Sequence, residues 1–423
     1  MKRISLLLAL ALLATLLSAF AFGASAADVS VWDGTQPETG AGNYGGGSGT
    51  EADPYLISSA EHLIRLSRNT NNGIETDKAY YYKLTCDITL NANYEESATW
   101  GTTPPANSFN PIRKGGMWYG HFDGDGHVIR GMYIAVSDSD SWKAVAGFCS
   151  GLSGSITNLG FENCYVKRSD EGNLAGVICA QLGNKGAATV ATIENVYVAD
   201  STLDVFRAGG MIAGRVYSGR VNNVYVTGAV NGRRNGEHDT GGLIGWVDND
   251  YASDTLTITN CYALATITVA GGNAYGAFAG NIQKIPGGTV NISNLYCNTA
   301  VAGVKAVGYV PAATATLLPA DYIKDLGDTA NAPAFTVAGM NLDANVWVDS
   351  DNGPVLKAFV KEAPAPETQA PATQAPTTQA PATQAPAASE DVTVPPEGDT
   401  ALAMVLLAAV CLTGSVIVLK KRH

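Results

Sequence analysis

The clearest pattern along the chain is a six-residue unit with apolar side chains at its first, fourth and sixth positions and asparagine at its third. The unit runs from Ile156 to Phe161 and recurs four times. Strict alternation breaks at the asparagine, and a left-handed bend there would return all three apolar side chains to one face. The pattern predicts bent strands with a stacked row of Asn158, Asn195, Asn223, Asn260 and Asn294.

A glycine-rich unit alternates with the first one. It combines two small residues, an apolar patch and a closing glycine, as in Gly209–Gly214. This composition is typical of a buried strand beside a tight turn. The two units alternate five times between 146 and 301, with connecting loops of different length. The glycines that mark the five copies are Gly147, Gly176, Gly210, Gly242 and Gly276.

Two strand-like units per repeat, stacked copy on copy, predict an all-β solenoid. Successive coils of such a fold lie about 4.8 Å apart, so asparagines at one position can bond to each other. The fifth position of the first unit then points outward. It is tyrosine in four copies, and we expect an exposed aromatic column of Tyr197, Tyr225, Tyr262 and Tyr296.

The segments on either side of the repeats complete the predicted body. We assign 27–145 to an N-terminal cap with the first coils, 146–301 to the repeats, and 302–360 to the C-terminal end of the solenoid. Within the cap, Ser58 and Glu61 have the spacing of a capping box before apolar residues at helical spacing. This short helix would cover the first open edge of the solenoid.

Both ends of the chain predict export and anchoring. Residues 1–26 combine Lys2 and Arg3, an apolar stretch and a closing Ala-Ser-Ala, which is the pattern of a secretory signal peptide. Residues 400–419 form an uncharged stretch long enough for a hydrocarbon core of about 30 Å, so we expect one transmembrane helix. The basic residues of 420–423 then predict a cytoplasmic tail, with the membrane as a partner.

A low-complexity spacer separates the body from the predicted span. Residues 361–399 are rich in Pro, Thr, Gln and Ala, and such a sequence forms a disordered, extended stalk. The end of the chain resembles the sorting signals that sortase cleaves in Gram-positive cell-wall proteins. Glu397 stands where those signals have threonine, and this departure favours membrane anchoring over sortase attachment to the wall.

The repeat units resemble the GLUG motif, named for its Gly-Leu-any-Gly core, with Gly242–Gly245 as the cleanest copy. The stretches Gly49–Ile57 and Trp347–Lys357 are similar to the usual opening and ending of GLUG-repeat cell-surface proteins of Gram-positive bacteria. The resemblance covers about 49–358. It implies that the solenoid is a right-handed parallel β-helix.

The charge balance excludes one class of partner. The chain carries a formal charge of −12, to which the signal contributes +2 and the tail +3, so the exported part carries −17. Nucleic-acid binding needs clustered Lys and Arg side chains. We therefore expect no nucleic-acid partner, and the sequence leaves the oligomeric state open.

Residue patterns for metal or cofactor binding are missing from the sequence. No CxxC pair occurs among its seven cysteines, and none of its five histidines lies in the His-Glu-x-x-His pattern of the GLUG-bearing metalloproteases that cleave immunoglobulin A. Asp123 and Asp125 fit Asp-Gly turns better than a calcium loop, which would need a further acid. Cys261 and Cys297 occupy inward positions, which favours free buried thiols. We expect no metal site and no cofactor.

The tyrosine column is the candidate ligand-binding feature, and its alternative role is a ladder of stacked rings that stabilises the coils. We expect a surface-displayed, non-catalytic binding or adhesion module for a glycan or an extracellular protein. A β-helical polysaccharide lyase or hydrolase is the first alternative, although no acid–base pair or Arg-x-Lys set is recognisable. A passive structural protein of the wall is the second. No catalytic residue is assigned.

Overall fold

The computed structural model describes the body of the chain. The described residues are 29–76, 78–136, 144–168, 174–233, 239–271 and 274–360. They belong to one compact unit. The predicted signal, stalk, membrane span and basic tail lie outside the described residues. None of the described helices is long and apolar enough to cross a membrane.

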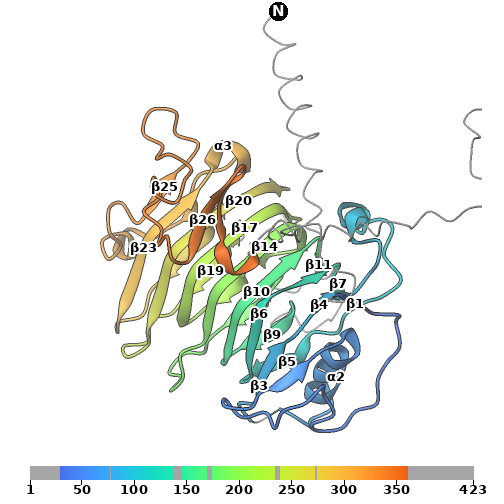
Figure 1. The fold of residues 1–423 in the computed structure, drawn as a ribbon. Coiled ribbons are helices and arrows are strands. Elements are labelled where there is room, and N and C mark those ends of the chain that lie inside the picture. Colours follow the sequence, from blue (N-terminus) through green and yellow to red (C-terminus); the bar gives the residue numbers. More distant parts are fainter. Residues whose placement is uncertain are drawn as a thin grey trace, which may run out of the picture. The chain divides into compact units, whose positions relative to one another are not determined.

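The described chain folds as a parallel β-helix, as predicted (Figure 1). Each full coil adds one strand to each of three parallel sheets, here named A, B and C. The main path of sheet A runs through β1 (Val29–Val31), β4 (Asp87–Thr89), β6 (His121–Arg130), β10 (Ser155–Glu162), β14 (Thr192–Val205), β17 (Gly219–Gly232), β20 (Leu256–Val269), β23 (Val290–Cys297) and β25 (Ile323–Asp325). Shorter strands of the same sheet are β2 (Tyr55–Ile57), β3 (Tyr81–Leu84), β7 (Tyr133–Val136) and β11 (Tyr165–Arg168).

The other two sheets carry the glycine-rich units, each of which begins in sheet C and ends in sheet B. The strands of sheet C are β8 (Ala144–Ala146), β12 (Leu174–Ala175), β15 (Ala208–Gly209), β18 (Thr240–Gly241) and β21 (Tyr275–Gly276). The strands of sheet B are β5 (Ile112–Trp118), β9 (Cys149–Leu152), β13 (Cys179–Leu182), β16 (Ala213–Val216), β19 (Ile244–Asp248), β22 (Ala279–Lys284) and β24 (Val307–Tyr309).

The bend at each asparagine explains why the first unit breaks strict alternation. Asn195 has a φ of 54°, and the five asparagines of the row have φ values between 51° and 56°. Ile193, Val196 and Val198 all point into the core and are fully buried, because the left-handed residue between them resets the alternation. The same positions pair in register with those of the next coil, so the core is continuous along the helix axis.

The marking glycines are required by close packing, both between coils and within the tight turn of a single coil. A Cβ atom on Gly242 would lie 2.1 Å from the carbonyl oxygen of Ala277, and one on Gly276 would lie 1.9 Å from that of Ala279. Both distances are far shorter than any contact that a real Cβ makes. The nearest heavy atoms are also below 3.0 Å for Gly147, Gly176 and Gly210.

A helix packs on the first coils, as the sequence predicts. In α2 (Ala60–Asn71), Leu63 and Leu66 are fully buried, and the helix contacts β5. The predicted capping box is wrong by one residue. The N-cap is Ser59, whose Oγ accepts a hydrogen bond from the backbone N–H of His62 at 3.3 Å, because Ser59 is the last residue with extended backbone. A short 3-10 helix, η1 (Tyr94–Thr99), follows β4.

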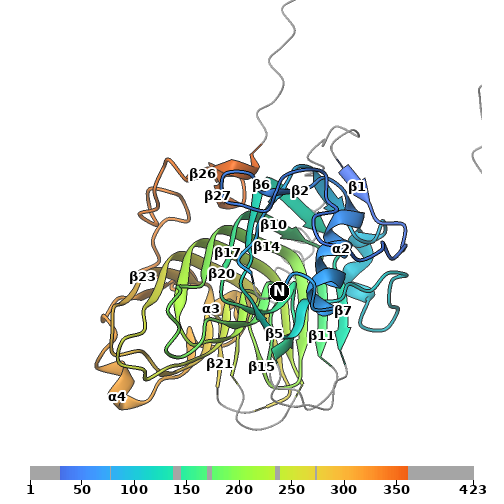
Figure 2. The ribbon, with the colours of Figure 1, turned by 90° about the horizontal axis from the view of Figure 1, so that it is seen from below.

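The last part of the 302–360 segment leaves the coil, although the sequence assigns it to the end of the solenoid. After α3 (Thr299–Ala302), β24, α4 (Ala312–Ala315) and β25, the chain turns back. It forms an antiparallel hairpin of β26 (Trp347–Ser350) and β27 (Gly353–Leu356), followed by η2 (Lys357–Phe359). The hairpin lies against the outer face of sheet A, the face that points away from the core (Figures 1 and 2).

Candidate functional site

The asparagine row divides the outer face of sheet A into two halves. The Nδ2 of Asn195 donates to the Oδ1 of Asn158 at 3.0 Å, and the Nδ2 of Asn223 donates to the Oδ1 of Asn195 at 3.0 Å. Asn294 bonds to Asn260 in the same way at 2.8 Å. The row therefore stacks from coil to coil, although successive coils differ in length by up to nine residues.

The row lacks one of its hydrogen bonds, the one from Asn260 to Asn223. The Nδ2 of Asn260 donates to the Oδ1 of Asn222 at 3.0 Å, and the Oδ1 of Asn223 accepts from the Nε1 of Trp347 at 3.4 Å. The hairpin thus bonds to the row at its middle. At the N-terminal end of the row, Asn158 donates to the carboxylate of Asp123 at 2.9 Å.

The tyrosine column lies on the C-terminal side of the asparagine row and is covered. Tyr197, Tyr225, Tyr262 and Tyr296 are at most 9% exposed. The rings of Tyr197 and Tyr225 stack at 5.1 Å between centroids, and those of Tyr225 and Tyr262 stack at 5.0 Å. The prediction that this column is exposed is therefore wrong. Its side chains do point away from the core, but the C-terminal segment packs over them.

Aromatic side chains of the C-terminal segment provide the cover. Trp347 is 1% exposed and contacts Tyr225 and Tyr262, while Phe335 and Phe359 meet the column edge to face. The hydroxyl of Tyr262 donates to the carbonyl oxygen of Pro354 at 2.6 Å. Burial raises the pKa of the column hydroxyls well above the ordinary value for tyrosine, so they are neutral donors at any physiological pH.

An ionic cluster closes the N-terminal end of the column. The Nε of Arg130 lies 2.7 Å from the carboxylate of Glu162, and its Nη1 lies 3.0 Å from that of Asp87. The hydroxyl of Tyr197 donates to Glu162 at 2.5 Å, and the Nδ1 of His127 lies 3.0 Å from Asp87. These side chains bond to one another, which favours a structural role for the cluster.

The other half of the face carries two polar rows, one on each side of the first apolar position of the unit. Residues in each row are partners in the parallel register and follow one another from coil to coil. The first row is Tyr81, His121, Ser155, Thr192, Arg220, Thr257 and Asn291. The second row is Lys83, Asp123, Thr157, Glu194, Asn222, Thr259 and Ser293.

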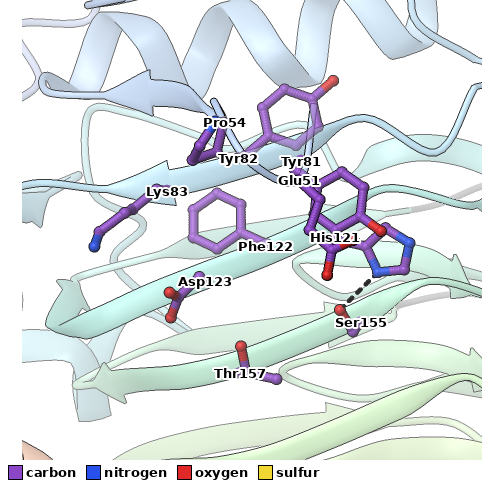
Figure 3. A pocket seen from close by; sticks show the side chains of 10 residues that line it. All are labelled: Glu51, Pro54, Tyr81, Tyr82, Lys83, His121, Phe122, Asp123, Ser155 and Thr157. Atoms are coloured by element: carbon purple, nitrogen blue, oxygen red, sulfur yellow. Dashed lines mark hydrogen bonds between the residues drawn. The ribbon is translucent and has the colours of Figure 1, made fainter. Parts of the chain in front are cut away.

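A hollow of about 240 Å³ lies where the two rows begin (Figure 3). Its aromatic wall is formed by Tyr81 and His121, whose rings stack at 4.4 Å with an interplanar angle of 20°. The Nδ1 of His121 lies 2.9 Å from the Oγ of Ser155. Pro54, Tyr82, Phe122 and Thr157 also line the hollow, and Glu51 reaches it from the loop before β2.

Charges in the hollow are mainly negative. Lys83 is held by Asp125 at 3.0 Å, which raises the pKa of the lysine. Asp123 accepts hydrogen bonds from Asn158 and from the backbone N–H of Asp125, both neutral donors. The latter bond is a turn of the Asp-Gly type, as the sequence suggests.

Metal and thiol chemistry find no support in the described part of the chain. No group of three or more His, Cys, Asp or Glu side chains in these residues is placed to hold a metal ion. Among the described cysteines, Cys149, Cys164, Cys179, Cys261 and Cys297 are free and buried. Burial raises the pKa of Cys164 and of Cys261 to about 12, so these thiols are protonated and unreactive at neutral pH.

The hollow was not predicted from the sequence. Its walls come from three separate segments, the Glu51–Pro54 loop, β3 and β6, together with the start of β10. One local signal was available. In the copies of the first unit, polar residues stand on both sides of the first apolar position, as with Ser155 and Thr157 beside Ile156. That pattern identifies a polar outer face, but it does not show which coil bears the hollow.

Comparisons with known proteins give partial matches. No family model matches the chain. Halomucin of Haloquadratum walsbyi is 29% identical over 168 residues, which are 39% of this chain and 2% of halomucin. A provisionally assigned Gly-rich membrane protein of Evansella cellulosilytica is 28% identical over 135 residues, 32% of this chain and 14% of that protein. The chain therefore matches only a small part of either relative.

One similar solved structure is the crystal structure of a provisionally assigned immunoglobulin A1 protease from Bacteroides ovatus. The TM-score is 0.49 and the identity 19%, with 74% of this chain and 95% of that chain covered. Similarity at this level gives no information on what the present chain binds or cleaves.

Proposed function

We propose that the protein is a surface-displayed, non-catalytic binding module that takes a glycan in the hollow at the start of the polar rows. The observation that carries the proposal is the stacked Tyr81–His121 pair in an open hollow surrounded by hydroxyl and carboxylate side chains. The tyrosine column is not part of this site, because the C-terminal segment covers it.

The chemistry of the hollow suits a sugar. A sugar ring has an apolar face that packs on an aromatic ring, and hydroxyls that both donate and accept hydrogen bonds. The hydroxyls of Ser155 and Thr157 can likewise donate and accept hydrogen bonds, and the carboxylate of Asp123 can accept them. The volume of about 240 Å³ is just below that of pockets for drug-sized ligands, so it fits one sugar unit of a longer chain.

The polar rows suit a polymer that runs along the helix axis. They continue from the hollow across the following coils, with Thr192 and Thr257 half-buried and Arg220 exposed. The backbone N–H and C=O groups of the inner strands are hydrogen-bonded within the parallel sheet. This face therefore offers only side chains to a ligand. An extended glycan would meet one side chain of the first row at every coil, whereas Asn222 and Thr259 of the second row are buried.

The proposed location is the outside of a Gram-positive cell, with the body held by the predicted stalk and membrane span. The predicted signal at 1–26 and the span at 400–419 are the sequence features behind it. The names of the two partial relatives, halomucin and a Gly-rich membrane protein, agree with a surface or membrane setting.

The test is binding of the full chain, purified in mild detergent, to a glycan array. We expect retention of at least one glycan, and at least tenfold weaker binding by Tyr81→Ala, because the aromatic wall is lost. Tyr251→Ala is the matched control, since Tyr251 is 51% exposed on a loop after β19. Equal binding by both variants, or retention of no glycan, would refute the proposal.

A polysaccharide lyase or hydrolase is the second candidate, and the ionic cluster is the observation in its favour. It brings two carboxylates, Asp87 and Glu162, together with Arg130 and His127. Release of reducing ends from any glycan, abolished by Glu162→Gln in a protein that still folds, would replace the binding proposal with this one. Binding without cleavage would exclude the lyase or hydrolase function.

A further inference from the structure

The hollow is lined by the carboxylates of Glu51 and Asp123, and its one lysine is engaged mainly by a third carboxylate, that of Asp125. Glu51 is exposed at its rim, and Asp123 lies in its floor, half-buried. Within the described residues, neither forms an ion pair. Lys83, which lines the hollow, is bound to Asp125 at 3.0 Å, and Asp123 has only a smaller effect on the pKa of this lysine. Figure 3 places Glu51 with Tyr81 at one end of the hollow and Lys83 at the other.

His121 does not supply the missing positive charge. Its ring is stacked on Tyr81, and its Nδ1 is in hydrogen-bond contact with Ser155. Burial lowers the pKa of His121 below its ordinary value, and the opposing effect of Glu51 is smaller. The other charged groups that line the hollow with it are Asp123 and Lys83. The lowered pKa favours the neutral imidazole, so the carboxylates leave the hollow as a whole negative.

We infer that the glycan taken by this site bears a free amino group, and that its ammonium binds among Glu51, Asp123 and the face of the Tyr81 ring. This inference rests on the proposed glycan-binding function and names the class of sugar. Charge-assisted hydrogen bonds from an ammonium to carboxylates are about twice as strong as neutral ones. A cation over an aromatic face gains further from the ring quadrupole.

The same charges select against acidic sugars. A uronate placed in the hollow would bring a third carboxylate close to Glu51 and Asp123, with Lys83 already engaged. Like charges at an interface suppress the wrong partner without improving the right one. A neutral sugar would bind through the aromatic wall and the hydroxyls alone. The order of affinity is therefore amine-bearing, then neutral, then acidic.

The experiment measures binding of the full chain to three hexasaccharides by calorimetry at pH 6. The hexamers are those of glucosamine, N-acetylglucosamine and galacturonic acid. We expect the glucosamine hexamer to bind about tenfold more tightly than the N-acetylated one, which is the difference between a charge-assisted and a neutral hydrogen bond. No binding of the galacturonate hexamer is expected. Raising the salt concentration should reduce the preference for the amine.

Two nearly isosteric substitutions test the carboxylates. In the double variant Glu51→Gln with Asp123→Asn, the ratio of the N-acetylglucosamine dissociation constant to that of glucosamine should fall to threefold or less, because the ammonium loses both carboxylates. The amide oxygen introduced at position 123 would still accept from Asn158, so the asparagine row is preserved. The control is Asp351→Asn, an exposed acid in the hairpin turn. It should leave the preference unchanged.

The outcomes separate this inference from the proposed function. Equal or tighter binding of the N-acetylated or the acidic hexamer overturns the amine inference and leaves glycan binding standing. Failure of all three hexamers to bind, together with an empty array, overturns both. A hexalysine peptide that binds more tightly than the glucosamine hexamer, through the same two carboxylates, would show that the ligand is a basic peptide instead.

Discussion

Replacing Tyr225 by alanine tests whether the tyrosine column is a structural stack. Tyr225 lies in its middle, with Tyr197 on one side at 5.1 Å and Tyr262 on the other at 5.0 Å. Its ring also contacts Trp347 at 6.0 Å between centroids, and 9% of its surface is exposed. The change therefore removes two stacked pairs and one contact to the hairpin at once.

The expected cost follows from this environment. Truncating a buried aromatic side chain to alanine typically destabilises a protein by about 3–5 kcal/mol. Each aromatic pair adds about 0.5–1.5 kcal/mol beyond burial of its area. Part of this cost can be offset, because the hairpin is not part of a coil and can shift into the cavity that the missing ring leaves. We therefore expect about 3 kcal/mol, at the lower end of the range.

The assay is urea unfolding of the full chain in mild detergent, followed by the circular dichroism of the β-helix. Tyr251→Ala is the control and should change the unfolding free energy by less than about 0.5 kcal/mol. A loss below about 1 kcal/mol for Tyr225→Ala would refute the reasoning. Removal of a ring that is buried beneath a packed hairpin should cost more than this. If that variant instead lost glycan binding at full stability, the column would be the binding surface after all.

Other predictions concern pH, charge and packing. The buried tyrosines have pKa values raised above about 10, so the stability that they contribute is complete below pH 10 and is lost as the pH rises further; absorbance should show tyrosinate forming only with unfolding, and a smooth titration of folded protein would contradict this. Arg130→Met leaves Asp87 and Glu162 without their cation and should cost about 3 kcal/mol in urea unfolding; an unchanged midpoint would mean that water already compensates them. Gly242→Ala should prevent folding or lower the melting temperature by more than about 10 °C, because its Cβ would meet the carbonyl of Ala277; a near-normal melting curve would show that the coils can move apart.

The repeat pattern was sufficient to predict the coil because it records local backbone preferences. Asn195 adopts the left-handed region that the broken alternation requires, and Ile193 and Val196 point inward on either side of it. The glycines can also be recognised from the repeat alone. Gly242, for example, stands where two coils touch and a side chain has no room. The helix before the first coil was also predicted, with its cap displaced from Ser58 to Ser59.

The exposure of the outer face could not be predicted in the same way. Trp347 bonds to Asn223, 124 residues earlier in the chain, and no periodicity connects the two. Nothing in the sequence around Tyr225 distinguishes an exposed ring from one covered by a distant hairpin. The hollow poses the same difficulty, because Glu51, Tyr81 and His121 meet only through the register of stacked strands.

The sequence by itself determined the architecture of this protein: the bend at each asparagine, the inward positions, the glycines between coils, and which side chains point away from the core. These properties depend on neighbours along the chain and on a repeat that brings equivalent residues together. The tertiary structure alone decided which outward side chains stay open. Packing of a C-terminal hairpin buried the tyrosines and left the hollow and the first polar row open, because burial of an outer face depends on contacts between residues far apart in the chain.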